Sequence, residues 1–154
     1  MNSLAEGLAI AGGVIALLGG VVGSSLGIGY AGSASTGALT LDPKRASSVY
    51  LLAALPMANV FFGLIVMLAF IIHVTSSPEI DLAKGIALFS LGLMAAGAEV
   101  FSGMKMGDVC AVGIAALPRT KGKIMLNALI ISVYVSIIGI LGMVFALMAL
   151  ALIG

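Results

Sequence analysis

The stretch that decides the fold runs from Ile86 to Gly103 and reads Ile-Ala-Leu-Phe-Ser-Leu-Gly-Leu-Met-Ala-Ala-Gly-Ala-Glu-Val-Phe-Ser-Gly. Its one charged side chain, Glu99, has apolar or small residues on both sides. An ionised carboxylate at the centre of a bilayer costs on the order of 3 kcal/mol by insertion scales. Acids inside a membrane are usually retained because they carry an ion, a proton or a partner, so Glu99 is the first functional candidate.

The composition places the chain in a membrane. Of its 154 residues, 62% are hydrophobic and only 8% are charged, and the mean hydropathy is +1.29. A soluble domain has about 25% charged residues. The formal net charge of +1 argues against nucleic acid as a partner. Cys110 is the single cysteine, so no internal disulfide can form.

Short polar breaks divide the chain into four apolar segments. A membrane-spanning helix needs about 20 apolar residues at a rise of about 1.5 Å per residue, and each segment is long enough. We therefore predict an all-α membrane protein with four transmembrane helices, arranged as two duplicated hairpins over residues 1–76 and 77–154. The expected helices cover roughly residues 8–41, 47–74, 82–117 and 124–153.

Basic residues predict the orientation. Lys44 and Arg45 lie in the first break, and Arg119, Lys121 and Lys123 lie in the third, whereas the second break is mainly acidic. The positive-inside rule places the first and third loops in the cytoplasm and both termini outside.

Glycines distinguish the first helix of each predicted hairpin from the second. Gly19, Gly23 and Gly27 recur every fourth residue in the first segment, and Gly103 and Gly107 do so in the third. Small residues at this spacing let helix backbones approach closely in lipid. A slim first helix and a bulkier second helix in each hairpin are what a ring with a crowded inner circle requires.

Several motifs resemble one known family. The runs Gly23-Ser-Ser-Leu-Gly-Ile-Gly-Tyr-Ala-Gly32, Asp42-Pro43 and Leu55-Pro56-Met-Ala-Asn-Val-Phe-Phe-Gly63 are similar to the first hairpin of the proteolipid subunit of V/A-type rotary ATPases. The second hairpin resembles it through Val100-Phe-Ser-Gly103 and Ile140-Leu-Gly142. The resemblance covers essentially the whole chain.

The resemblance implies a rotor ring of identical copies, which turns in the lipid past a membrane stator subunit while ions pass. The central stalk would contact the loops at residues 42–46 and 118–123. It implies no cofactor and no catalytic site in this chain, because ATP is hydrolysed elsewhere in the complex. On family grounds we expect a prokaryotic plasma membrane.

One departure from the family is large. The family has its ion-binding glutamate in the middle of the fourth helix, and the fourth segment here has no carboxylate. Spacing from nearby prolines and glycines aligns that position with Ser132, Val133 or Ser136, and none of these can carry a charge. In the second helix, where sodium-binding members often read Leu-Pro-Gly-Thr-Gln, Asn59 can still offer an oxygen atom but Ala58 cannot replace a hydroxyl.

Glu99 is the substitute that the sequence offers. If the third and fourth helices are antiparallel, Glu99 lies at the depth of Ile140, and Ser136 is about 6 Å away along the axis. Ser102 shares a helix face with Glu99. We therefore predict an ion site of Glu99, Ser102 and Ser136, to which Asn59, Ser132 or Tyr134 can add an oxygen. Burial favours the neutral carboxyl, and the few polar groups favour H⁺ over Na⁺ as the carried ion.

The alternative is a structural or channel-like membrane oligomer, in which Glu99 locks helices together or lines a pore. In the family the third helix belongs to the inner circle, so Glu99 would have to point outward between two outer helices. Lys105 is six residues from Glu99 and faces elsewhere, and we expect it to pair with Asp108.

Overall fold

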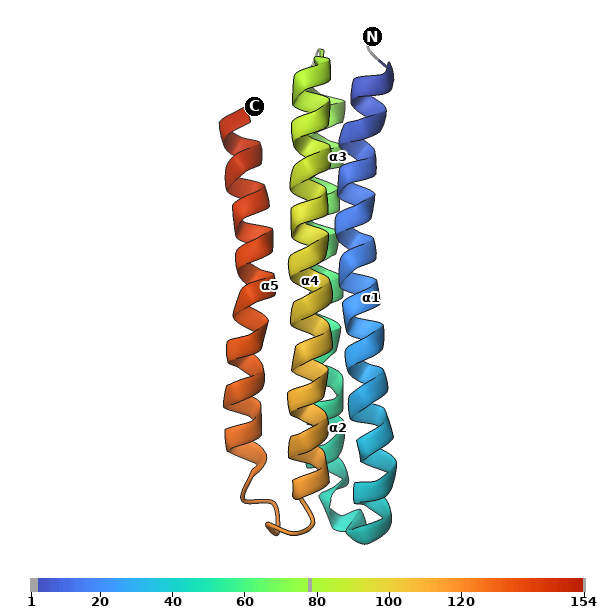
Figure 1. Cartoon of the computed structure of the whole chain (residues 1–154), viewed down its shortest axis with the longest axis vertical. Coiled ribbons are helices and arrows are strands. Elements are labelled where there is room, and N and C mark those ends of the chain that lie inside the picture. The colour runs from blue at the N-terminus through green and yellow to red at the C-terminus, as the bar shows by residue number, and fades with distance from the viewer. Residues whose placement is uncertain (1–2, 78, 154) are drawn as a thin grey trace.

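The computed structural model describes residues 3–77 and 79–153, and within them the chain is almost entirely helical with no strand (Figure 1). Two short 3-10 turns join α1 to α2 and α2 to α3, so that α2 and α3 form one broken span. By length and composition four helical stretches can cross a membrane, which confirms an integral, multi-pass, all-α protein. The elements are α1 (Ser3–Leu41), η1 (Pro43–Arg45), α2 (Ala46–Ala54), η2 (Leu55–Met57), α3 (Ala58–Ser76), α4 (Leu82–Ala116) and α5 (Met125–Ile153).

The helix boundaries differ from the predicted ones mainly at their beginnings. The first helix begins at Ser3 rather than near residue 8. Its first turn contains Glu6, which lowers the local hydropathy but is favourable at the start of a helix. The second span begins at Pro43, since proline at the first helical position needs no N–H partner. The division into two duplicated hairpins stays a prediction.

The break in the second span is caused by Pro56. Proline has no N–H to donate, and its ring collides with the carbonyl one turn earlier. The Ser24 hydroxyl of α1 donates a 2.7 Å hydrogen bond to the Pro56 carbonyl oxygen. The 3-10 turn η2 is therefore anchored to α1, one turn from Asn59.

The closest helix pair is α1 and α4, which run parallel. A Cβ atom on Gly85 would stand 2.6 Å from the carbonyl oxygen of Ala5, and one on Gly103 would stand 2.6 Å from the carbonyl carbon of Gly23. Each contact joins residues 80 positions apart, so the two helices stay in one register over most of their length. The glycines predicted to pack, namely Gly19, Gly23, Gly27, Gly103 and Gly107, all lie against the main chain of the other helix.

The remaining spans cover this pair unequally. The α3 helix runs antiparallel to α1, where Gly63 lies against Ala16 and Gly13 against Met67. The α5 helix has its main contacts with α4 and fewer with α3. In Figure 1 it stands on the far side of α4 from α1. It is thus the least embedded of the four spans in a single chain.

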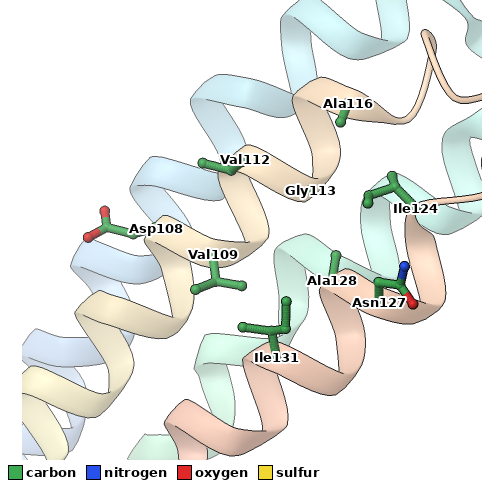
Figure 2. Close-up of a pocket in the computed structure, with 9 residues that line it drawn as sticks. All are labelled: Asp108, Val109, Val112, Gly113, Ala116, Ile124, Asn127, Ala128 and Ile131. Atoms are coloured by element: carbon green, nitrogen blue, oxygen red, sulfur yellow. The ribbon is translucent and has the colours of Figure 1, made fainter.

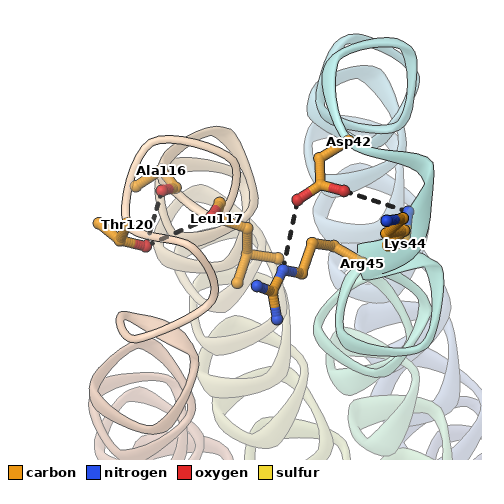
Figure 3. Close-up of polar contacts among 6 residues, drawn as sticks. All are labelled: Asp42, Lys44, Arg45, Ala116, Leu117 and Thr120. Carbon is orange, nitrogen blue, oxygen red and sulfur yellow. Dashed lines mark hydrogen bonds and ion pairs between the residues drawn. The ribbon is translucent and has the colours of Figure 1, made fainter.

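The two basic loops lie at the same end of the molecule and touch (Figure 3). Asp42 accepts a hydrogen bond from the Lys44 N–H (3.2 Å) and pairs with Arg45 Nε (3.3 Å). Gly122 has a φ of +85°, and a Cβ atom there would stand 2.6 Å from a guanidinium nitrogen of Arg45. The first loop therefore rests against the third, at a glycine whose backbone conformation suits no other residue well.

Candidate functional site

Glu99 is fully buried where α3, α4 and α5 meet. Gly139 of α5 marks the centre of the cluster, because a Cβ atom on it would stand 2.8 Å from Glu99 Oε2, 3.0 Å from Ser102 Oγ and 3.2 Å from Asn59 Nδ2. These three polar atoms therefore surround a single point. The carboxyl group of α4 thus lies against the two helices that flank the α1–α4 pair.

The hydrogen bonds of the cluster leave the carboxyl group without a donor. Asn59 Nδ2 donates to the main-chain oxygen of Glu99 (3.0 Å), and Ser102 Oγ donates to the main-chain oxygen of Val135 (3.2 Å). Within the described residues, Glu99 Oε1, Glu99 Oε2 and Asn59 Oδ1 are buried and have no hydrogen-bond partner. Buried oxygens without a donor are costly. A proton on the carboxyl group, or a small cation, would satisfy these oxygens.

In the part of the chain that the structure describes, no basic side chain forms an ion pair with Glu99. Lys105 pairs with Asp108 at 3.0 Å on the exposed surface of α4, which confirms the predicted pair. The described residues contain no group of three or more His, Cys, Asp or Glu residues that could hold a metal ion. A cation at Glu99 would therefore rely on carboxyl, amide and hydroxyl oxygens, which are the ligands that hard cations prefer.

The other predicted site residues lie at different distances from the carboxyl group. Ser136 is 9% exposed and lies three residues from Gly139 on α5, within one helical turn of the cluster. Ser132 instead lies beside Cys110 (3.2 Å between Sγ and Oγ) and donates to the Ala128 carbonyl oxygen. Cys110 is eleven residues from Glu99, about 16 Å along α4.

Tyr134 does not reach the cluster. Its side chain is 65% exposed, on the outside of the four-helix unit. The structure thus brings Asn59 and Ser102 to Glu99, keeps Ser136 nearby, and separates Ser132 and Tyr134 from the carboxyl group.

Gly139 is the site residue that the sequence interpretation did not include. The depth argument pointed to Ile140, which is one residue further along and 36% exposed. A shift of one residue turns a helix by about 100°, so depth alone could not select the face. A glycine at the predicted depth was the signal available in the sequence.

A second feature is an apolar groove of about 410 Å³ between α4 and α5, nearer the loops (Figure 2). Val109, Val112 and Ala116 of α4 line one side, and Ile124 and Ile131 of α5 line the other. Asp108 lies at its edge and Asn127 contributes an amide. Because α5 stands on the far side of α4 from α1 (Figure 1), the groove between α4 and α5 lies on the flank of α4 that faces away from α1.

Two comparisons with known proteins bear on this architecture. The family model for the ATP synthase C-subunit matches residues 11–70 of the chain. The V-type sodium ATPase subunit K of Enterococcus hirae is 28% identical over 123 residues, which are 80% of this chain and 77% of that protein. The similarity extends beyond the first two spans into the second half of the chain.

Proposed function

We propose that this chain is a proteolipid subunit of the V/A-type ATPase family and that it carries its ion on Glu99. The family is that of ion-translocating ring subunits of a rotary ATPase. The observation that carries the proposal is the buried Glu99 carboxyl group inside a transmembrane helix, with both nearby side-chain donors bound to main-chain oxygens. In this proposal Glu99 replaces the carboxylate that the fourth helix lacks.

The ion that we propose is H⁺. One proton neutralises the carboxyl group and gives it an O–H, and the unpartnered Asn59 Oδ1 is an acceptor in the same cluster. A neutral acid can then cross the apolar rim of the membrane at far lower cost than a carboxylate. Na⁺ is the second candidate, since the E. hirae relative is named as a sodium ATPase subunit. It would need several oxygen ligands besides the carboxyl group.

The ring would deliver this carboxyl group to a stator subunit. In the single chain Glu99 is covered by α5, so we infer that α5 moves when the site meets the stator and a stator cation draws the proton off. The touching loops at residues 42–46 and 118–123 would face the cytoplasm and the central stalk, with both termini outside, in a prokaryotic plasma membrane. The chain itself would hydrolyse no ATP.

Two exposed apolar stripes support a specific contact between neighbouring copies of the chain in the ring. Val14 and Val21 are exposed on α1, two residues beyond the α4-facing Gly12 and Gly19, so they lie about 200° around the helix from that contact. Met94 and Phe101 are exposed on α4, two residues beyond Gly92 and Glu99, whose backbones face α1. The two stripes therefore lie on opposite flanks of the α1–α4 pair.

Both stripes also lie at the same depth. The offset of 80 residues between α1 and α4 puts Val21 level with Phe101. The α3 helix packs against both glycine-rich helices, α1 and α4. Among the described residues, α5 packs against α4 but has no comparable contact with α1. We infer that α1 of the next copy occupies this place, against the α4 stripe and the groove of Figure 2. Repetition of such a head-to-tail contact generates a ring when the rotation between successive copies closes on itself.

A disulfide cross-link tests this contact. We expect the chain with Val21→Cys and Phe101→Cys, in a Cys110→Ala background, to form a ladder of linked copies on oxidation in the membrane. Bridged cysteines need Cα atoms within about 7 Å. The pair Val21→Cys and Val112→Cys is the control, because its depths differ by eleven residues, about 16 Å. An equal ladder from both pairs, or none from the first, would contradict the contact.

Labelling with a fluorescent hydrophobic carbodiimide tests the role of Glu99. This reagent reacts with protonated carboxyl groups, so we expect modification at Glu99 that decreases as the pH rises, mapped by mass spectrometry on the intact complex. Protection by sodium at constant pH would change the ion to Na⁺. Asp108, which is exposed on the same helix, is an internal comparison. Modification at Asp108 with none at Glu99 under any condition would leave Glu99 as a helix-locking residue.

A further inference from the structure

The most sharply defined feature of the site is a missing side chain. One Cα hydrogen of Gly139 points toward the Glu99 carboxyl group, since a Cβ atom in its place would stand only 2.8 Å from Oε2. Carbon and oxygen atoms that are not bonded normally stay beyond about 3.3 Å. The carboxyl group therefore occupies space that any other residue at position 139 would fill.

The same backbone segment is tied to the second polar group of the cluster. The Val135 carbonyl oxygen accepts the Ser102 hydroxyl at 3.2 Å. In an α-helix that oxygen also accepts the N–H of the residue four positions on, which is Gly139. Ser102 thus holds the turn of α5 that contains Gly139 directly over the carboxyl group.

The other close glycine of α5 has a different surrounding. A Cβ atom on Gly142 would meet the methyl group of Ala98 and the main chain of Ala95, all without a polar side chain. Gly142 therefore serves close packing of α5 on α4. Of the two α5 glycines, Gly139 is the one that combines close packing with contact to three polar side chains of the site.

We propose that Gly139 is the positioning residue of the ion site: its missing side chain forms the recess that holds the Glu99 carboxyl group and its ion against Asn59 and Ser102. This inference rests on the proposed function, since it specifies how the carrier group is held. The site then consists of the Glu99 carboxyl group from α4 and the Asn59 amide from α3, and Gly139 of α5 leaves the space that the carboxyl group occupies. A carboxyl group pushed out of the recess loses its fixed position beside Asn59.

The test compares matched variants in the assembled ATPase complex. Gly139→Ala is expected to lower ATP-driven ion transport and the rate of carbodiimide labelling at Glu99 about tenfold, because overpacking of one methyl group has an effect of that size. Gly142→Ala is the steric control on the same helix. Thermal stability of the ring is measured for every variant, so that a general loss of packing is recognised.

Rescue by a shorter acid separates positioning from packing. Glu99→Asp withdraws the carboxyl group by one methylene, which makes room for the new methyl group. We expect Glu99→Asp to restore transport in the Gly139→Ala chain to within about threefold of Glu99→Asp alone, a coupling typical of residues in contact. It should restore nothing in the Gly142→Ala chain.

The inference is overturned if Gly139→Ala transports ions at the wild-type rate. It is equally overturned if Glu99→Asp fails to rescue Gly139→Ala or rescues both glycine variants alike. Failure of the proposed function has a separate signature, which is wild-type transport in the Glu99→Gln chain whatever the Gly139 variants do.

Discussion

Replacement of Glu99 by glutamine is expected to abolish ion transport by the ring while the ring still assembles. Glutamine has nearly the same shape, but its amide neither gains nor loses a proton near neutral pH, and it has no charge with which to hold a cation. The buried, donor-free surroundings of Glu99 suit a neutral group, so the amide costs the fold little. Transport should fall at least about 100-fold, because a group that cannot be deprotonated leaves nothing to transfer. The measurement is ATP-driven ion uptake into vesicles that contain the complex, with ring assembly followed by native gel electrophoresis.

Asp108→Asn is the matched control for this substitution. It removes a carboxylate from the same helix, but one that is exposed and paired with Lys105. An exposed pair of this kind contributes little to stability, and we expect transport within about twofold of wild type. Normal transport by the Glu99→Gln chain would instead favour the structural or channel-like alternative, in which the carboxyl group only locks helices.

The second large effect is expected at the contact between α1 and α4. Gly103→Ala puts a methyl group 2.6 Å from the carbonyl carbon of Gly23, where the obstacle is main chain and cannot rotate away. The two helices must separate over the turns that contain Glu99. Overpacking in a tight core costs about 1–3 kcal/mol, and we expect the upper end of that range because no side-chain rotation can relieve the clash. The measurement is the thermal midpoint of the purified ring, with Glu99 labelling as the second readout.

Gly37→Ala is the control on α1, away from both proposed stripes. A Cβ atom at position 37 meets nothing within 4 Å in the described part of the chain. Alanine is preferred to glycine in a helix by up to about 1 kcal/mol, so this variant should be as stable as wild type or more so. Equal losses in the two variants would show that the parallel α1–α4 contact does not depend on its glycines.

The sequence by itself determined the class and the main functional candidate. The chain is 62% hydrophobic, and three short polar breaks divide it into long apolar segments. Such segments cross a membrane as helices, because a helix satisfies its own backbone hydrogen bonds in lipid. Glycines every fourth residue indicated close helix packing, and a single acid in an apolar run singled out Glu99. These signals are local, because each depends on the cost of placing a residue type in lipid or in a helix.

Only the tertiary structure decided which groups surround that acid. Asn59, Ser102 and Gly139 come from three helices, and their meeting depends on how each helix is rotated about its axis. One residue turns a helix face by about 100°, so the predicted depth of Ile140 could not select the face of Gly139, and it could not show that Tyr134 faces outward. Rotation is set by the packing of α1 on α4 and of α5 on α4. This packing depends on many weak contacts between segments far apart in the chain. The rotation of each helix therefore cannot be predicted from a local sequence pattern.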